Sequence, residues 1–545
     1  MMLRRCSFLI VLLLVCAPIV AHANEFPRVG GVLIRDKEEV LHNRTLPWLS
    51  AADVVMVAPN PGQMSSNYVS HFTAVKQANP DLLLFRYINI TELNEAWGGW
   101  EGIVDSMYNR FSNPNRGGQN TAGDGWARPA SGSTINSWGL NTAVNIMDYV
   151  TPYNGNNGSA SSDNDLSKPR VGERPVDFMS RQNYYARVQP IESVIDGVYE
   201  DVNRRWPKVN ADWDNNGGNS GTNQYTHDEA QRKWREALIR GRDNMVGPTF
   251  NGQNSPSGRS NGRAWLQNGG YYLVNASSWL LGKEGGDYLD GVAPLPRIPE
   301  YEQQSHGGNH EKLLGWETSR GGLWADGTAT PFSSATKSLQ AALLSFNFSM
   351  SHSRTLPELG HPAFVFETFA ENLHMARYSL VAGLMSDGIV QILDLRIGAR
   401  PWMLDEYVGR DYTALSQQGI HNHRKWLGHA IDPAYPNMRT SNGGRVLMRE
   451  FEHGLAIILA GRSHRDDHMD KTATVNLPSP GNGYQWARIE GRQDSSWNNG
   501  NVVGDTIKLG TTAANVNRNA IILRRVAATA TTANEAPKAP TLGIN

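Results

Sequence analysis

The chain has 545 residues, with 51 lysines and arginines against 52 aspartates and glutamates. This balance excludes the strong basic charge through which proteins bind nucleic acid or anionic membranes, so we expect no nucleic-acid partner. Its two cysteines, Cys6 and Cys16, both lie near the N-terminus, which excludes disulfides, thiol chemistry and cysteine-ligated metals from the rest of the chain.

The first 23 residues have the pattern of a secretory signal peptide. A pair of arginines precedes the apolar stretch Phe8–Val15, which is too short to span a membrane, and Ala21–Ala23 supplies small residues for cleavage before Asn24. A lipid anchor at Cys16 is the alternative, disfavoured by the valine before it. No later stretch is apolar enough to span a bilayer, so we expect a secreted or periplasmic monomer with 49 basic and 52 acidic residues.

Short buried runs alternate with helical stretches over most of the chain. This alternation is typical of parallel sheets built from βα units, and eight such runs predict a (β/α)8 TIM barrel, an α/β fold. The expected strands are Val29–Ile34, Asp53–Ala58, Leu82–Ile90, Asp196–Val202, Gly270–Asn275, Tyr288–Val292, Pro362–Thr368 and Gly388–Asp394.

Two regions depart from this alternation. Residues 97–168 form a long insertion rich in Gly, Asn and Ser with dispersed tryptophans, including Trp138, and we expect it to build a wall beside the barrel mouth. After residue 440 the helices stop and short strands follow, which predicts an antiparallel β-sandwich. The expected organisation is a signal peptide at 1–23, a catalytic barrel at 24–440, a sandwich at 441–526 and a disordered tail at 527–545.

The fourth expected strand, Asp196–Val202, ends in two adjacent acids, Glu200 and Asp201. Because side chains alternate along a strand, the two acids point to opposite sides, and only one can face the barrel axis. Barrels of this kind carry their chemistry at the carboxyl ends of their strands. Tyr199 and Asp201 share one side, and we expect this side to face the mouth, whereas Glu200 points toward the helices unless the strand bulges.

In the order of its elements the chain resembles bacterial secreted glycoside hydrolases of the TIM-barrel type, distantly similar to the α-amylase-like and polygalactosaminidase-like barrels. The resemblance covers most of the mature chain and implies a secreted enzyme that cleaves O-glycosyl bonds. The passages that carry it are Asp196–Val202, Leu404–Tyr407, Trp426–Gly428 with Asp432–Ala434, and Arg449–Leu455 with Ala520–Arg525.

Glycoside hydrolysis needs two carboxyl groups that flank the bond. The resemblance implies that Asp201 is the nucleophile or base, because it matches the acid at the end of the family's fourth strand. The sixth strand departs from the family pattern, since no Glu follows Asp290-Gly291. Glu302 is therefore the expected proton donor, and Glu367 at the end of the seventh strand competes for that role.

Further polar and aromatic residues suit a poly- or oligosaccharide, whose rings offer apolar faces edged by hydroxyl groups. The second hypothesis is a non-catalytic carbohydrate-binding or cell-surface assembly protein on a barrel scaffold, since a fold does not fix a function. The expected substrate-binding residues are Asp36, Arg86, Glu92, Trp138, Glu200, Asn275 and Asp394.

The sequence requires no cofactor, although two patterns suggest metals. Asp212, Asp214 and Asn216 match the opening of a calcium-binding loop, with Asn223 at the position of the usual bidentate Glu, so a structural Ca²⁺ competes with a plain surface turn. A metal-assisted hydrolase using His306, His310 and Glu311 is a third hypothesis, disfavoured because Gly307-Gly308 oppose the helix that such a zinc site uses.

Overall fold

The computed structural model describes somewhat more than half of the chain. The described residues are 25–33, 45–58, 66–94, 101–111, 125–128, 133–138, 141–155, 168–201, 207, 211–214, 228–246, 271–275, 305–314, 339, 343, 346–347, 350–351, 353–356, 358–370, 372–394, 400–442, 445–459, 472–511 and 517–528.

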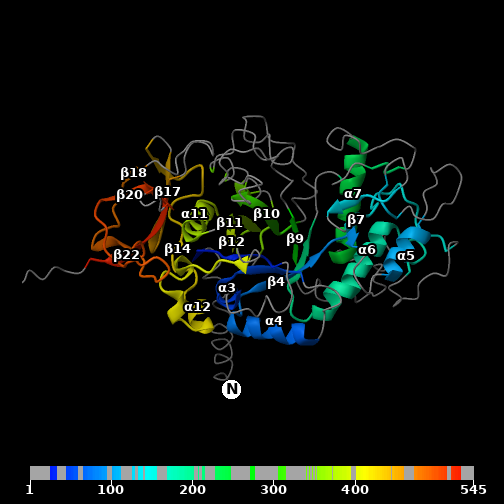
Figure 1. The fold of residues 1–545 in the computed structure, drawn as a ribbon, viewed down its shortest axis with the longest axis horizontal. Helices are drawn as coiled ribbons and strands as arrows, with labels where there is room; N and C mark the ends of the chain where they lie inside the picture. Colours follow the sequence, from blue (N-terminus) through cyan, green and yellow to red (C-terminus); the bar gives the residue numbers. More distant parts are fainter. Residues whose placement is uncertain are drawn as a thin grey trace, which may run out of the picture.

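A nine-stranded sheet forms the centre of the molecule (Figure 1). Eight of its strands are parallel and lie in chain order, and a short ninth strand, β13, runs antiparallel to the last of them. The strands are β2 Gly30–Leu33, β3 Val54–Val57, β4 Leu83–Ile88, β8 Gly197–Glu200, β9 Tyr271–Asn275, β10 Gly307–Leu314, β11 Ala363–Ala370, β12 Ile389–Asp394 and β13 Arg400–Pro401.

The two faces of this sheet belong to different hydrophobic clusters. Inward residues such as Phe85, Tyr199 and Val365 form one cluster among strands, with Tyr87 at its edge. The alternate residues, such as Val198 and Phe366, join a much larger cluster shared with the helices. Strand residues are therefore buried on both sides, which explains why the sequence shows continuous apolar runs.

The sheet curls until its first and eighth parallel strands meet. Val29, just before β2, forms a single parallel bridge with Val390 of β12. Beside it, the fully buried Gln391 side chain accepts a hydrogen bond from the Val32 backbone nitrogen and donates one to the Val32 carbonyl, both 2.8 Å. Gly31, with φ +145°, leaves room for this amide, because a Cβ there would lie 2.1 Å from the Gln391 side chain.

One expected strand is in the wrong place. The sixth strand was expected at Tyr288–Val292, which lies outside the described residues, but β10 pairs with both β9 and β11. The sixth position is therefore taken by Gly307–Leu314. Its polar sequence lacks the buried apolar run that marks the other parallel strands, and this explains why the pattern missed it.

Helices cover the outer side of the sheet. The α-helices and shorter helical turns are α3 Thr45–Ala51, α4 Ser66–Ala78, α5 Glu101–Asn109, α6 Pro175–Asn183, η2 Tyr184–Val188, η3 Gln189–Ile191, α7 Asp228–Val246, α11 Leu373–Leu384, η6 Asp405–Tyr407, η7 Tyr412–Ala414 and α12 Gln417–His423. The sequence predicts a helical stretch from Asn183 to Val194, just before the fourth strand. The observed helix starts earlier, as α6, and changes to a π-helix at Tyr184 and a 3₁₀ turn at Gln189.

The described part of the long insertion lies at one end of the molecule with α6 and α7 (Figure 1). It contributes α5 and the strands β6 Asn136–Trp138 and β7 Asn141–Ala143, which form a three-stranded sheet with β5 Glu92–Asn94. Trp126 is buried and packs on Tyr108, with ring centroids 5.4 Å apart, so it is a core residue and does not line the expected wall. Trp97 and Trp100 lie outside the described residues.

Buried ion pairs join α6 to its surroundings. The buried Asp177 carboxylate accepts from Arg240 at 2.6 and 2.7 Å and from Asn244 at 2.8 Å, both on α7. It also caps its own helix by accepting from the Arg174 backbone nitrogen. Asp177 therefore fixes α7 against α6.

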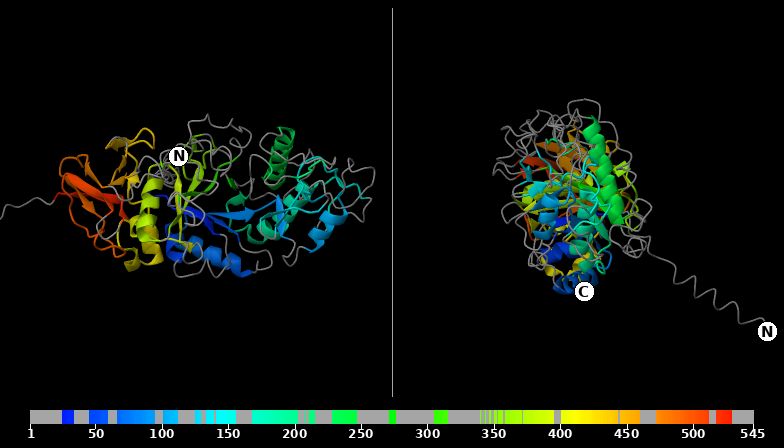
Figure 2. Two further views of the ribbon diagram at one scale, coloured as in Figure 1. Left: turned by 45° about the horizontal axis from the view of Figure 1, so that its top comes forward. Right: turned by 90° about the vertical axis from the view of Figure 1, so that its right-hand side faces the viewer.

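Two antiparallel sheets occupy the opposite end of the molecule (Figures 1 and 2). The inner faces of both share one hydrophobic cluster, which includes Ile457, Trp486 and Ile507. The other face of the larger sheet packs against α11. The strands of the first sheet are β15 Arg439–Ser441, β16 Val446–Phe451, β17 Gly454–Leu459, β19 Tyr484–Arg488 and β22 Ala520–Ala527, and those of the second are β18 Ala473–Asn476, β20 Thr506–Thr511 and β21 Asn517–Arg518. Separately, β1 Glu25–Phe26 pairs with β14 Gly428–His429.

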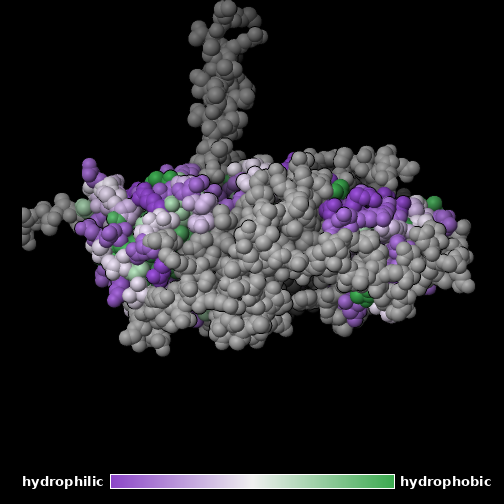
Figure 3. Space-filling view, turned by 90° about the horizontal axis from the view of Figure 1, so that it is seen from above, coloured by the Kyte–Doolittle hydropathy of each residue, from purple (hydrophilic) through white to green (hydrophobic). Residues whose placement is uncertain are grey.

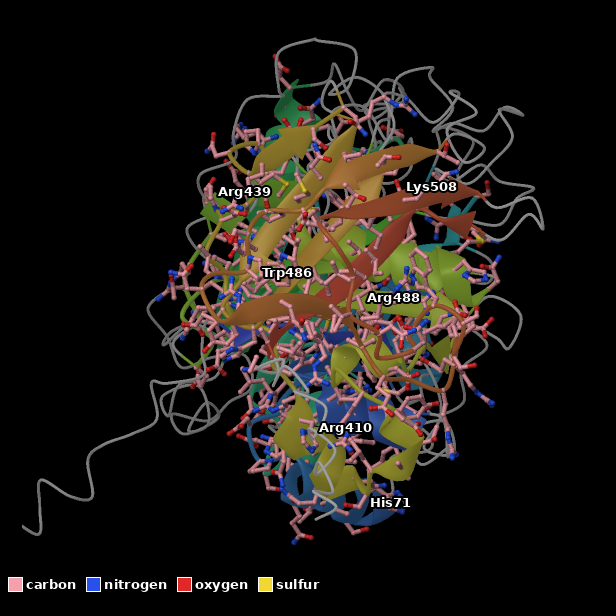
Figure 4. The ribbon with its side chains drawn as sticks, turned by 90° about the vertical axis from the view of Figure 1, so that its left-hand side faces the viewer. His71, Arg410, Arg439, Trp486, Arg488 and Lys508 are labelled. Carbon is pink, nitrogen blue, oxygen red and sulfur yellow. The ribbon has the colours of Figure 1, made fainter. Side chains whose placement is uncertain are left out.

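The face seen in Figure 3 is mainly hydrophilic over the described residues, with isolated hydrophobic spots. Figure 4 shows the C-terminal strands with Arg439, Trp486, Arg488 and Lys508 above the segment that carries Arg410. Among the described helices, none is both long and apolar enough to cross a membrane.

Candidate functional site

Asp201 comes directly after β8 and is the centre of the candidate site. Its backbone nitrogen donates to the Ile88 carbonyl at 3.0 Å, which extends the parallel pairing of β4 and β8 by one residue. Tyr199, two residues earlier, belongs to the inner cluster, whereas Val198 belongs to the outer one. By alternation Asp201 lies on the inner side, at the carboxyl end of its strand. It is half-buried, so the carboxylate keeps contact with solvent.

Tyr87 on the neighbouring strand holds this carboxylate. Its hydroxyl donates a hydrogen bond to Asp201 Oδ2. Tyr87 is paired in register with Tyr199, and their ring centroids lie 5.8 Å apart. Two tyrosine rings and one carboxyl group thus share the inner side of β4 and β8.

Glu367 occupies the inner side of another strand end. It lies on β11, where Ala363 and Val365 of the same alternation belong to the inner cluster. It is buried and pairs in register with Gln391 of β12. The structure therefore places Asp201 and Glu367 on the same side of the sheet, toward its carboxyl-terminal edge.

Arg86 and Glu200 lie on the other side of their strands. Both are fully buried. Arg86 donates through Nε to the Arg187 carbonyl at 3.1 Å and through a terminal nitrogen to the Val57 carbonyl at 3.0 Å. Such positions support the inner residues from behind and do not offer a sugar direct contact.

Two other residues that were expected to bind substrate, Glu92 and Asp394, have structural roles instead. The buried Glu92 carboxylate accepts from Asn141 at 3.3 Å and from Asn89 at 3.5 Å, which ties β7 of the insertion to the end of β4. Asp394, also buried, pairs with Arg400 across β12 and β13. By alternation with Val390 it faces the outer side.

Several expected site residues are only partly located. Asn275 ends β9 and Trp138 ends β6, and the description covers only their backbone. The residues that lie outside the described part of the chain are Asp36, Asn216, Asn223 and Glu302.

The structure bears differently on the two metal-binding patterns, the calcium loop and the histidine pair. Asp212 is buried and Asp214 half-buried beside Trp213, which packs on Trp234 at 5.8 Å; the calcium loop itself stays a prediction. Among the described residues, no three His, Cys, Asp or Glu side chains are grouped to hold a metal. His310 lies within strand β10 and His306 just before it, so the two do not share the helix that such a zinc site uses.

The motifs of the family resemblance hold the C-terminal sheets to the centre. Glu406 pairs with Arg377 of α11 and accepts from Asn498 at 2.8 Å. Arg449 of β16 donates to the Leu384 carbonyl at 3.0 Å and also pairs with Asp387. Through these buried contacts the Leu404–Tyr407 and Arg449–Leu455 passages have a structural role.

Tyr87 and Arg187 are site residues that the sequence reasoning missed. Tyr87 lies within an expected strand, two residues after Phe85. Because residues two apart in a strand share a side, the sequence indicated that both face the same way, and the structure places both on the inner side. No local signal pointed to Arg187, since its position follows from the π-helix.

Comparison with known protein families and with curated proteins finds no match. Similar solved structures are glycoside hydrolases. The maltogenic α-amylase AmyB of Thermotoga neapolitana is 9% identical, with 92% of this chain and 99% of that chain covered and a TM-score of 0.41. The Geobacillus thermoleovorans α-amylase is 9% identical, with 94% of this chain and 100% of that chain covered and a TM-score of 0.39. The glycoside hydrolase domain of PelA from Pseudomonas aeruginosa is 10% identical, with 69% of this chain and 98% of that chain covered and a TM-score of 0.34. Likeness this low carries no argument, so function rests on the chain's own residues.

Proposed function

We propose that this protein is a secreted glycoside hydrolase that cleaves a poly- or oligosaccharide at the carboxyl-terminal mouth of a (β/α)8 barrel. The observation that carries the proposal is the half-buried Asp201 carboxylate, inward at the end of β8 and held by the Tyr87 hydroxyl. A solvent-accessible acid in this position has the place and partner of a nucleophile or base.

The strand register supports the barrel. If the register of the seven parallel pairings is followed from β2 to β12, Val29 lines up with Ala382. The observed bridge instead joins Val29 to Val390, which is eight residues further along the chain. An eight-stranded barrel with helices outside closes with a shear of eight. The single bridge and the Gln391 amide are then the closing seam of the barrel.

The chemistry needs a second carboxyl group, protonated when the first is ionised. Glu367 shares the inner side with Asp201 and is buried. Glu302 stays the other candidate for this proton donor. In this scheme the Asp201 carboxylate attacks the anomeric carbon, or deprotonates the attacking water, while the protonated Glu releases the leaving sugar.

A carbohydrate-binding protein without catalysis is the second candidate function. The buried Glu367 favours it, because an acid that substrate does not reach cannot donate a proton. This candidate predicts that the protein retains glycans but releases no reducing sugar.

The test is reducing-sugar release from a panel of bacterial and plant polysaccharides. Asp201→Asn should fold normally and lose at least about 100-fold in rate, since an amide cannot act as nucleophile or base. Glu200→Gln is the matched control on the opposite side of the same strand, expected to retain catalysis. Glu367→Gln and Glu302→Gln decide between the two proton donors. An active Asp201→Asn protein beside an inactive Glu200→Gln protein would contradict the assignment.

The proposal extends to the rest of the chain. Residues 1–23 direct export, residues 24–440 form the catalytic barrel and 441–526 the β-sandwich behind it. A Ca²⁺ ion at Asp212, Asp214 and Asn216 would be structural, because hard oxygen ligands bind this cation.

A further inference from the structure

A π-helix lies immediately before the strand that carries the site. Helix α6 continues without a break into the π-helical turn η2, and η3 then leads toward β8. A π-turn widens the backbone and changes the direction of the side chains it contains, and such turns are frequent at functional sites. The buried Arg187 lies on this turn, and its carbonyl accepts from Arg86 Nε.

The two arginines lie behind Tyr87. Burial, and then the neighbouring Arg187, holds the pKa of Arg86 well below its usual range, and burial lowers the pKa of Arg187 to about 10. For both groups the Tyr87 phenol acts in the opposite sense and raises the pKa. The two guanidinium groups and the Tyr87 phenol are therefore close enough to interact.

We propose that Tyr87 is a positioning residue for Asp201. Its hydroxyl fixes the orientation of the carboxylate within the site. The inference rests on the proposed function, because it gives a role within that reaction. The assembly is formed by β4, η2 and β8, which meet only in the folded chain.

Geometry supports this role over a plain packing role. Tyr87 is half-buried, like Asp201, whereas the tyrosine paired with it, Tyr199, is buried. The described charged and titratable groups around Tyr87 are Arg86, Arg187, Tyr199 and Asp201. A ring that served packing alone would not need its hydroxyl on a carboxylate.

The test compares Tyr87→Phe with Tyr378→Phe, which removes a buried hydroxyl from α11 in the outer layer. Tyr87→Phe should lower kcat roughly 10- to 100-fold with little change in KM, the loss expected for a hydrogen bond to a charged group. The control should match the wild type in both kcat and KM. An unchanged kcat in Tyr87→Phe, with Asp201→Asn inactive, would overturn the inference and leave the proposed function standing.

A second readout does not depend on activity. Water-soluble carbodiimide labels accessible carboxyl groups, and mass spectrometry maps the label on Asp201. At one fixed pH, labelling of Asp201 should be faster in Tyr87→Phe than in the wild type and the control, because the carboxyl group is no longer held by the Tyr87 hydroxyl. Identical labelling rates in the three proteins would refute the inference even if no glycan is hydrolysed, and the absence of hydrolysis would refute the proposed function separately.

Discussion

Replacing Gln391 by methionine tests whether one side chain closes the central sheet. The two residues have similar size, so the change removes two hydrogen bonds while the space stays filled. The Val32 backbone nitrogen and carbonyl then lose partners that lie at 2.8 Å, in a place where Gln391 is fully buried. Each unsatisfied buried group costs about 1–3 kcal/mol, so the free energy of unfolding should fall by about 4 kcal/mol.

The assay is urea unfolding followed by tryptophan fluorescence, with Gln418→Met as the matched control. Gln418 is exposed on α12, where its amide donates to Asn422 at 3.1 Å, so the same chemical change should alter stability by no more than about 0.5 kcal/mol. Hydrogen exchange at the Val32 amide gives a local readout. If opening of the seam becomes easier by 2 kcal/mol, that amide exchanges roughly 30-fold faster.

Equal stability of the Gln391→Met and Gln418→Met proteins would refute this reasoning. So would an unchanged exchange rate at Val32, because the amide would then be protected by something other than Gln391. A large loss of stability with normal exchange at Val32 would place the damage away from the seam.

Three further predictions concern buried charges. Asp177→Ala should cost about 3 kcal/mol or more, because Arg240 and the rest of the α7 contact lose their partner, and faster proteolysis of α7 would show it; unchanged proteolysis would contradict the role of the pair. Burial, and then Arg28, lowers the pKa of His361 to about 3 in the folded protein, from 6.5. The unfolded chain therefore binds a proton that the native protein does not as pH falls from about 6.5 toward 3, and this residue should remove stability at about 1.4 kcal/mol per pH unit. His361→Gln should flatten the acid side of the stability profile, and an equal slope in both proteins would contradict this. Arg377→Met should cost about 3–5 kcal/mol because it leaves Glu406 buried with a lost charge partner, and calorimetry should show the C-terminal sheets melting earlier, whereas an unshifted transition would speak against it.

Local patterns were sufficient for most of the central strands. Seven of the eight expected runs coincide with observed parallel strands within a few residues, because strands buried on both faces require continuous apolar sequence. The start of α6 was also readable, since Pro175 stands at its first position and Asp177 caps it, but the helix was placed too late. The polar sixth strand lacked the apolar signal and was missed.

The sequence by itself determined which acids lie at strand ends and, through alternation, that Glu200 and Asp201 point to opposite sides. It could not determine what those side chains meet. Tyr87 and Asp201 are 114 residues apart, and Gln391 and Val32 are 359 apart. Only the tertiary structure decides such contacts, because strand order and register bring distant segments together, and neither follows from the local propensities that mark a strand.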